Sequence, residues 1–569
     1  MSMSPLPSQT ARQASPPETV DVLIIGGGIN GISTFRELAL QGVSVVLMER
    51  DDFCSGASAA LSRMVHGGLR YLENGEFRLV RQSLEERDRL LQNAPHCVSP
   101  LPTVVPILTW FRGTLATTAA FFNLAGKPRH RPGVMVRLGL TLYDLMSRHS
   151  RTMPRHKGLS RAALHRLVPG ITDNAVGGVL YYDARVTHPE RLGVEMVIDS
   201  EMAGDAHAFS YTEIVSGDRT GLNWRDRLSG AEGRIVPKVV VNATGAWVDK
   251  VSTRIERPDA QERVEGTKGS HLMVDNEALK AALGDRMVYY ENADGRICIT
   301  FAHAGSVMVG STDIRVDDPD SAVCFEDEKA YMLSALASVF PTIDIKDEEI
   351  IHVFTGVRPL PVSAEGFTGR ISRDHSVDVE APGTRDYAVL TLIGGKWTTF
   401  RIFGEEVADM VLSRLNVPRK ADTHNLRIGG GRDLPADPAS KENWLASIVS
   451  RTGLADERVR TLAGRYGSRA ADVADFTTKE TDSPLAAAND YSCREILFLV
   501  ENERVRELGD VLLRRTTLGI EGRITPDLVT EVAALISGPL GWSEADRLAA
   551  IDRFNQRFAR RHRTQQRTD

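Results

Sequence analysis

The stretch from Val20 to Glu49, VDVLIIGGGINGISTFRELALQGVSVVLME, constrains the fold of this chain more than any other. It reads as a β-branched apolar strand, a glycine turn, a helix and a second strand, which together make a βαβ unit of a parallel sheet. Gly26, Gly28 and Gly31 have G-x-G-x-x-G spacing, which allows a tight turn, close approach to a pyrophosphate, and close packing of helix on strand. The helix N-terminus suits a diphosphate, and Glu49 ends the second strand, where a carboxylate accepts hydrogen bonds from ribose hydroxyls. The stretch therefore predicts a dinucleotide site.

Length, charge and cysteine usage narrow the class of protein. A chain of 569 residues is too long for one core and should form two or three domains. A net charge of −6 argues against nucleic-acid binding. The five cysteines form no CxxC, which fits a reducing compartment and predicts no metal site. No run reaches the roughly 18 apolar residues of a spanning helix, so we expect a soluble or peripheral protein.

Other segments indicate how the remainder is organised. Residues 1–19 are rich in Ser, Pro and Thr and are expected to be a disordered lead-in. The strand at 387–393 runs into Gly394 and Gly395, so we expect the chain to return there and complete the first sheet. Residues 265–365 predict a largely antiparallel sheet. Residues 421–569 have helical periodicity throughout.

Two basic segments could each be a solvated surface or a surface that binds an acidic partner. Residues 100–150 mix arginines with aromatic and aliphatic residues; a solvated basic face is favoured over a patch facing anionic lipid. The tail from Arg553 to Arg567 is expected to be solvated, with association to an acidic surface as the alternative.

A series of motifs in order resembles the FAD-dependent glycerol-3-phosphate dehydrogenases, the membrane-associated respiratory family. HGGLRYLE and GVRP are the most specific of them. The segments are IGGGINGIS, MVHGGLRYLENGEFRLV at 64–80, NATGAW at 242–247, KGSHL at 268–272, GSTD at 310–313, TGVRPL at 355–360, GGKWTT at 394–399 and LLRRT at 512–516.

The resemblance implies an α/β (α+β) fold with three parts. These are a Rossmann-like FAD-binding domain of the glutathione-reductase/D-amino-acid-oxidase type, an antiparallel-sheet substrate domain and an all-helical C-terminal domain. The FAD-dependent oxidoreductase region is expected at 20–420 and the helical domain at 421–569. Within the first region, the FAD-binding parts are expected at about 20–100, 170–250 and 365–420, and the substrate sheet at about 265–365.

The resemblance also implies residue roles, beside what each side chain suits chemically. Arginine grips a phosphate bidentately and lysine acts as a point charge, although a lone arginine is usually a surface ion pair. Histidine is the natural general base for an alcohol proton. The substrate-binding candidates are Arg70, Tyr71, Thr312, Arg358 and Lys396, and the catalytic candidates are His271, Arg358 and His66. The cofactor-binding candidates are Gly26, Gly28, Asn30, Gly31, Glu49, Ser62, His66, Gly67, Gly68, Thr244, Gly245, Gly394, Gly395, Lys396 and Thr398.

The activity implied is oxidation of glycerol 3-phosphate to dihydroxyacetone phosphate by hydride transfer to flavin N5, with electrons passed to a quinone. A cytoplasmic homodimer, peripheral on the inner face of the membrane, is implied with it. Two departures keep the substrate open: Ala59-Ala60-Leu61-Ser62-Arg63 replaces a serine-rich run ending in lysine, and residues 111–128 resemble an insertion. A longer polyol phosphate such as erythritol 4-phosphate, or oxygen as acceptor, stays open. So do an amine or amino-acid oxidase and a flavin-binding sensor without turnover.

Overall fold

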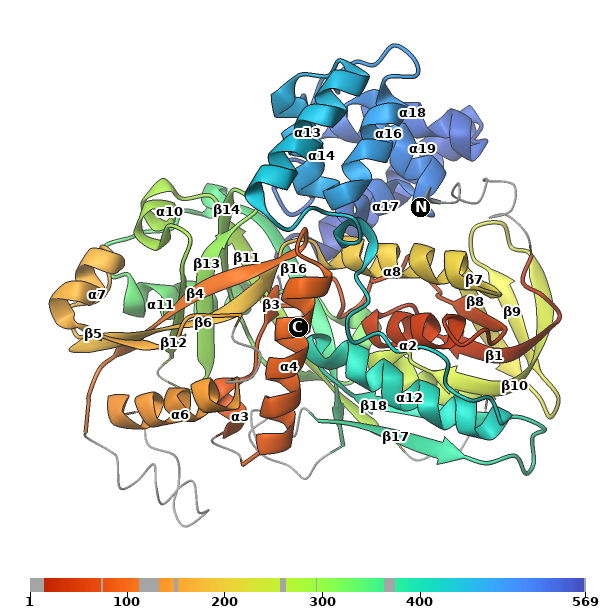
Figure 1. Cartoon of the computed structure of the whole chain (residues 1–569), viewed down its shortest axis with the longest axis horizontal. Coiled ribbons are helices and arrows are strands. Elements are labelled where there is room, and N and C mark those ends of the chain that lie inside the picture. Colours follow the sequence, from red (N-terminus) through yellow and green to blue (C-terminus); the bar gives the residue numbers. More distant parts are fainter. Residues whose placement is uncertain are drawn as a thin grey trace.

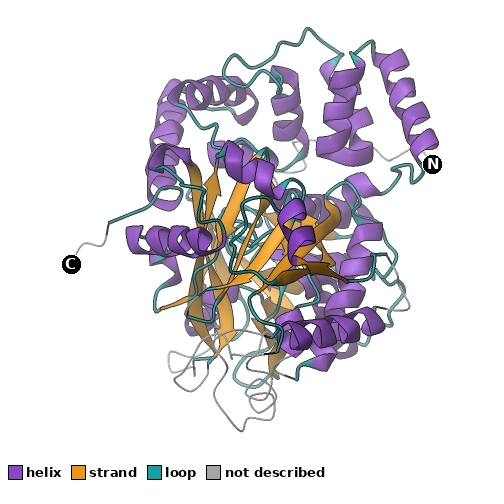
Figure 2. Cartoon of the chain, turned by 90° about the vertical axis from the view of Figure 1, so that its left-hand side faces the viewer, coloured by secondary structure: helices purple, strands orange, loops and turns teal. Residues whose placement is uncertain are grey.

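The computed structural model describes residues 15–72, 75–111, 132–147, 152–255, 262–292, 294–362 and 374–566. Most of the expected lead-in, residues 112–128 of the expected insertion and the side chain of Arg70 lie outside this description. Two sheets with their helices form the body of the molecule, and a helical domain sits on top of them (Figures 1 and 2).

The first sheet is built around the βαβ unit predicted from the sequence. Its order is β17-β18-β10-β1-β2-β7. β1 (Thr19–Ile25) lies between β10 (Glu232–Asn242) and β2 (Val45–Met48), parallel to both. β18 (Ala388–Gly394) pairs with β10 in parallel, which confirms that the chain returns to this sheet. β7 (Ala206–Phe209) and β17 (His375–Glu380) are its edges, while β8 (Thr212–Gly217) and β9 (Leu222–Asp226) extend β10 as an antiparallel ribbon.

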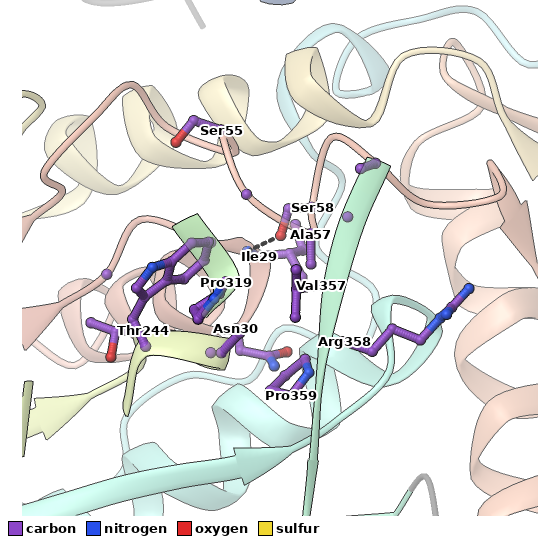
Figure 3. A pocket seen from close by; sticks show the side chains of 18 of the residues that line it. Ile29, Asn30, Ser55, Ala57, Ser58, Thr244, Pro319, Val357, Arg358 and Pro359 are labelled. Carbon is purple, nitrogen blue, oxygen red and sulfur yellow. Dashed lines mark hydrogen bonds between the residues drawn. The ribbon is translucent and has the colours of Figure 1, made fainter. Parts of the chain in front are cut away.

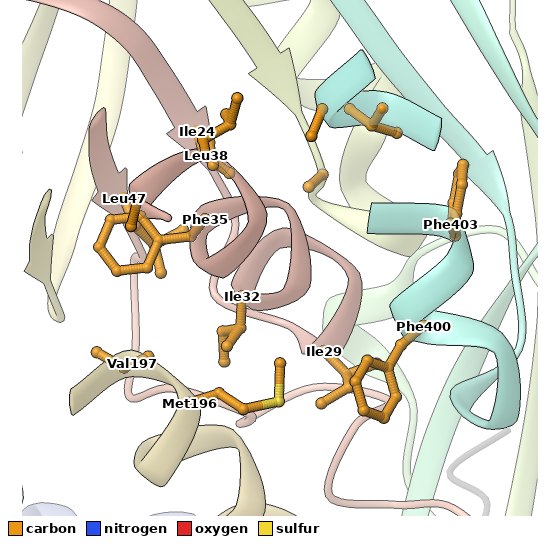
Figure 4. Close-up of a cluster of buried hydrophobic side chains, with 14 of the residues drawn as sticks. Ile24, Ile29, Ile32, Phe35, Leu38, Leu47, Met196, Val197, Phe400 and Phe403 are labelled. Carbon is orange, nitrogen blue, oxygen red and sulfur yellow. The ribbon is translucent and has the colours of Figure 1, made fainter. Parts of the chain in front are cut away.

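Three helices cover one face of this sheet and bury its main core. They are α2 (Ile29–Ala39), α8 (Pro189–Ala203) and α12 (Phe400–Leu415). Ile32 of α2 points toward Met196 of α8, and Phe35 of α2 points toward Leu47 of β2. Phe403 of α12 belongs to the same buried cluster (Figure 4). Helix α8 begins directly after its N-cap residue, His188. The opposite face is covered by α9 (Val248–Ile255).

The second sheet has ten strands and is antiparallel except where β12 meets β4. It starts earlier in the chain than residue 265, because two long strands pair along their whole lengths and join it: β4 (Val98–Ile107) and β6 (Gly177–Val186). Its other strands are β3 (Met64–Val65), β5 (Lys157–Ser160), β11 (Val264–Val274), β12 (Met287–Glu291), β13 (Ile297–His303), β14 (Ser306–Gly310), β15 (Ile314–Val316) and β16 (Ile350–Pro361). The helices α7 (Arg161–Leu167), α10 (Glu277–Leu283) and α11 (Glu326–Val339) contribute to a core with this sheet.

Short and long helices connect these layers. α3 (Leu69–Leu72) and α4 (Phe77–Asn93) follow β3, and α6 (Gly133–Met146) packs near them. In the part of the chain that the structure describes, no helix is long and apolar enough to cross a membrane.

The C-terminal domain is helical, as predicted, and has a core of its own. Its helices are α13 (Pro438–Thr452), α14 (Asp456–Tyr466), α15 (Ala470–Thr477), α16 (Cys493–Asn502), α17 (Leu508–Asp510), α18 (Pro526–Leu540) and α19 (Glu544–Arg561). The tail after α19 is not simply solvated: His562 Nδ1 lies 3.1 Å from the carbonyl oxygen of Val353 on β16, and Gln565 bridges to Phe325. The domain is therefore fastened to the second sheet at its far end.

Candidate functional site

A cavity of about 450 Å³ lies at the carboxyl ends of the parallel strands, between the two sheets. Ile25 of β1, Met48 of β2 and Gly394 of β18 line it from the first sheet. The β16 segment Val357–Pro359 lines it from the second sheet (Figure 3). Ligands of open parallel sheets bind at this edge, so this cavity is the candidate site.

The glycine turn after β1 forms a cradle that side chains would fill. Gly26 has φ +106°, and a Cβ there would meet the carbonyl oxygen of Ala243 at 2.7 Å. A Cβ on Gly31 would lie 2.0 Å from the oxygen of Gly26, so Gly31 serves helix–strand packing and does not line the cavity. Gly28 is the N-cap of α2 and has no side chain to cap the helix, although Ser58 from the neighbouring loop accepts from the Ile29 N–H. The start of α2 therefore presents backbone to a ligand.

Glu49 lies at the rim of this cradle, as the sequence predicted. Its Oε2 accepts a hydrogen bond from Gly27 N–H at 2.7 Å, and its Oε1 accepts one from Asp51 N–H at 2.9 Å. Burial, with the nearby Asp51 adding, raises the pKa of Glu49 to about 7. The carboxyl group is fixed in position by two backbone donors.

The polar groups beside α2 fit an extended dinucleotide such as FAD. Asn30 lines the cavity, and its buried Oδ1 has no hydrogen-bond partner among the described residues. Ser58 Oγ accepts from Ile29 N–H at 2.9 Å (Figure 3). Gly395, at φ +92°, leaves only 2.9 Å between an added Cβ and the Asn30 amide nitrogen. The unpaired Asn30 Oδ1 lies beside two glycine turns, an arrangement that suits a large cofactor.

His271 occupies the second-sheet side of the cavity. It lies on β11, its Nε2 is 2.8 Å from Ser62 Oγ, and its ring stacks on Phe354 at 5.0 Å between centroids. Burial, with the positive charges of Arg358 and Arg63 adding to it, lowers the pKa of His271 to about 3. The imidazole is therefore neutral at physiological pH.

The candidate cations Arg358 and Lys396 both line this cavity. Arg358 Nη1 lies 3.2 Å from Asp313 Oδ1, and its Nη2 donates to Ser311 Oγ at 3.4 Å. Lys396 Nζ donates to Ser83 Oγ at 3.0 Å and lies 4.3 Å from the ring centroid of Tyr71. Both side chains are held by neighbours and still line the cavity. The arrangement suits a dianionic group such as a phosphate ester.

His66 and Tyr71 complete this end of the cavity. Their rings stack at 6.3 Å between centroids, and the His66 backbone N–H donates to Thr398 Oγ1 at 3.3 Å. Ser62 and Thr398 also line the cavity, as do Thr244 and Gly245 at the end of β10. The backbone of Arg70 lies in α3 beside them.

The structure does not bring three of the other candidates into the cavity. Thr312 is buried: its Oγ1 accepts from Ser270 N–H at 3.0 Å and donates to Glu328 Oε2 at 3.1 Å. That hydroxyl is therefore engaged in the protein interior, and a substrate contact for Thr312 is not supported. Gly67 and Gly68 shape the turn before α3. The Gly67 N–H donates to Tyr143 Oη at 2.9 Å. Gly68 has φ +79°, and a Cβ there would lie 2.0 Å from the ring of Tyr71. Neither glycine lines the cavity.

Trp247 and Arg561 are examples of cavity residues that sequence reasoning missed. Trp247 is covered by Arg50 at 4.6 Å, and its Nε1–H donates to Asp320 Oδ1 at 3.0 Å. It belongs to the NATGAW motif, so a signal was present. Arg561 reaches the cavity from the C-terminal domain, and no local pattern marks it.

Comparisons with known proteins cover nearly the whole chain. The family model for FAD dependent oxidoreductases matches residues 21–410, and that for the C-terminal domain of alpha-glycerophosphate oxidase matches residues 421–547. A glycerol-3-phosphate dehydrogenase of Synechocystis sp. is 30% identical over 94% of this chain and 96% of its own length. A D-erythritol 1-phosphate dehydrogenase of Brucella abortus is 31% identical over 88% of this chain and 94% of its own.

A solved structure shares the fold. The glycerol-3-phosphate dehydrogenase from Bacillus halodurans, complexed with FAD, superposes with a TM-score of 0.72 at 23% identity, covering 95% of both chains. The FAD dependent oxidoreductase model covers the first sheet, which carries the cofactor cradle, and the second model covers most of the helical domain. FAD is the cofactor of this protein. With both models in order and relatives aligned almost end to end, the chain belongs to the FAD-dependent glycerol-3-phosphate dehydrogenase family.

Proposed function

We propose that the protein oxidises the secondary alcohol of glycerol 3-phosphate to dihydroxyacetone phosphate, with hydride passing to flavin N5 and electrons passing on to a quinone. The observation that carries this proposal is the placement of Arg358, Lys396 and the neutral His271 around the cavity that also holds the cofactor cradle. A phosphate requires cations, and an alcohol proton requires a base. A substrate that carries both a phosphate and a hydroxyl group therefore matches Arg358, Lys396 and His271.

Each part of the site has a separate task. Bound FAD supplies the acceptor for the hydride. Arg358, oriented by Asp313 and Ser311, grips the phosphate, while Lys396 adds a point charge. β16 and the Ser55–Ala60 loop form walls of the cavity.

The charge of Arg358 also affects the basicity of His271. The guanidinium lowers the pKa of His271 after burial has lowered it. A phosphate dianion bound to Arg358 offsets that positive charge, so the imidazole becomes a better proton acceptor when substrate is present. Ser62 holds the ring through its 2.8 Å contact with Nε2. In this way the substrate phosphate assists removal of the hydroxyl proton.

Flavin bleaching by glycerol 3-phosphate without oxygen tests the proposal directly. Arg358→Ala should abolish bleaching and turnover while FAD stays bound, because Arg358 lies away from the α2 cradle (Figure 3). A variant that keeps the wild-type KM and kcat would show that the phosphate lies elsewhere. A D-amino-acid panel in the same assay separates this enzyme from an amine or amino-acid oxidase.

A longer polyol phosphate is the second candidate substrate. The relative from Brucella abortus that is 31% identical is named a D-erythritol 1-phosphate dehydrogenase, so related cavities accept a tetritol. Bleaching compared across triose and tetrose polyol phosphates decides between the two. Peroxide production, measured with and without a quinone, decides between oxygen and quinone as the acceptor.

Contact with the membrane face, where a quinone resides, is part of the proposal. Helix α6 exposes Leu138 and Leu145 by 62% and 58%, with Val134 on the same face of the helix. Phe111, 75% exposed, lies just before this region. An apolar stripe on one helix face suits shallow insertion into a bilayer surface. Leu138→Glu should reduce binding to vesicles. The homodimer stays a prediction, which light scattering checks.

A further inference from the structure

A second cavity, of about 410 Å³, lies where the C-terminal domain meets the two sheets. It is lined by the residues that follow β2, by His352–Thr355 of β16 and by the last turns of α19. Arg50, the Ser55–Ala60 loop and Arg561 lie between it and the FAD cavity, since they contribute to both. Nothing in the proposed reaction uses this space.

The charges that line the second cavity do not balance. Its lining contains eight arginines and five carboxylates, and each carboxylate is already paired with one of these arginines. The pairs are Arg50–Asp320, Arg63–Glu190, Arg227–Asp51, Arg514–Asp52 and Arg553–Glu507. Three arginines remain, Arg557, Arg560 and Arg561, and no carboxylate lies within ion-pair distance of them among the described residues. His352 and His562 add no charge, because burial lowers the pKa of both.

The three remaining arginines lie on one face of α19. Their spacing of three and four residues places them side by side over the last turns of the helix. The helix dipole stabilises cations near a helix C-terminus. This explains why arginines occur in the last turns of α19, but it does not explain why they line a cavity. Burial lowers the pKa of Arg561, and the charges of Arg557, Arg50 and Arg560 lower it further, against an opposing effect of Asp51. The three residues are exposed to solvent as well as lining the cavity, and an anion bound there would offset their like charges.

We propose that this cavity binds a soluble phosphate or diphosphate anion, held by Arg557, Arg560 and Arg561 together with Arg50. Guanidinium groups bind phosphate oxygens bidentately, which suits arginines that lie close together on the last turns of one helix. Of these, Arg560 also donates to the backbone oxygen of Asp320 at 3.1 Å. Arg50 directly follows Glu49, so the bound anion connects α19 to the strand end that carries the cofactor site. Anion binding and FAD retention are therefore coupled, each strengthening the other.

The test uses the FAD-saturated holoenzyme and pyrophosphate as the probe, with binding followed by calorimetry. The wild type should bind, and R557Q/R561Q should bind at least about tenfold more weakly, because each lost arginine removes charge-assisted hydrogen bonds. R557K/R561K keeps the charges and should retain most of the affinity, which separates loss of the site from misfolding. R547Q is the matched control, because Arg547 lies on the same helix but pairs with Glu544 at its exposed start. Its affinity should equal that of the wild type.

Four results would overturn the proposal. One is a wild-type holoenzyme that binds neither phosphate nor pyrophosphate at millimolar concentrations. Another is loss of FAD from R557Q/R561Q without any anion binding by the wild type, which would assign these arginines to the cofactor itself. A third is R557Q/R561Q binding anionic vesicles less well while the wild type ignores pyrophosphate, which would assign them to a lipid headgroup. The last is an equal loss of affinity in R547Q, which would show that binding is nonspecific.

Discussion

At the scale of single residues, Glu49 links the glycine turn to the cofactor. Its carboxylate is held by the N–H groups of Gly27 and Asp51, so its acceptor positions are fixed before any ligand binds. Glu49→Ala should weaken FAD binding by about ten- to a hundredfold, in line with the loss of one hydrogen bond to a charged group. Flavin fluorescence in the filtrate after ultrafiltration measures this. Full flavin occupancy after gel filtration would count against a ribose contact.

His271 is the residue on which the proton step depends. Because its neutral ring is held by Ser62 and stacked on Phe354, replacement by Asn keeps polarity but removes the base. His271→Asn should lower kcat by about 10²- to 10⁴-fold, the usual contribution of a general base, with FAD content unchanged. An unchanged kcat would assign the base elsewhere, and His66 is the next candidate to test.

At the scale of elements, the contact between α2 and β1 fixes the cofactor cradle. A Cβ on Gly31 would clash with the Gly26 oxygen at 2.0 Å, so α2 must shift to accommodate it. Gly31→Ala should cost about 1–3 kcal/mol of stability, as overpacking does, and should release FAD. Gly464→Ala is the control: a Cβ there meets nothing within 4 Å on α14, and the change should be neutral or slightly stabilising. Urea unfolding of both variants measures the difference, and equal stability would show that α2 packs less tightly than described.

The sequence predicted elements better than it predicted their partners. Glycine turns and β-branched runs are local signals, so the βαβ unit, the antiparallel sheet over 265–365 and the return of β18 were all foreseeable. The membership of β4 and β6 in the second sheet depends on strands far away in sequence, which no local pattern reveals. Within GSTD, Ser311 and Asp313 contact Arg358 while Thr312 faces the interior. A motif does not tell which of its neighbouring side chains faces a ligand, because successive side chains of extended backbone point to opposite sides.

At the scale of the whole molecule, buried neutral histidines make stability depend on acidity. His188, His271, His303, His352 and His562 all have a pKa below 6.5, with burial as the first cause. In the unfolded chain they take up protons as the pH falls through 6.5, while in the folded state they do not. The free energy of unfolding should therefore fall below pH 6.5, by up to about 1.4 kcal/mol per pH unit for each histidine. Carboxyl groups whose pKa is raised by burial, such as Glu49, Asp183 and Asp199, oppose this effect.

A variant isolates one of these contributions. His352 is stacked with His562 and lies near Phe354 and Phe558, so phenylalanine suits its surroundings. His352→Phe should reduce the slope of unfolding free energy against pH below 6.5 by up to about 1.4 kcal/mol per pH unit. Substituting the surface residue His207 by Gln should leave the slope unchanged. Urea unfolding at a series of pH values measures both, and identical slopes for wild type and His352→Phe would contradict the assignment.

The ion pair between Asp52 and Arg515 joins the C-terminal domain to the segment that follows β2. Both side chains are fully buried, and Arg514 joins them from the same C-terminal segment. A second buried pair, between Arg191 of α8 and Glu503, crosses the same boundary. Removing one partner of such a pair leaves a charge stranded in the interior, at a cost of about 3–5 kcal/mol. Separating the helical domain from the first sheet would leave Asp52 and Arg191 buried without their partners, so deleting the domain removes part of the stability of the cofactor-binding region as well.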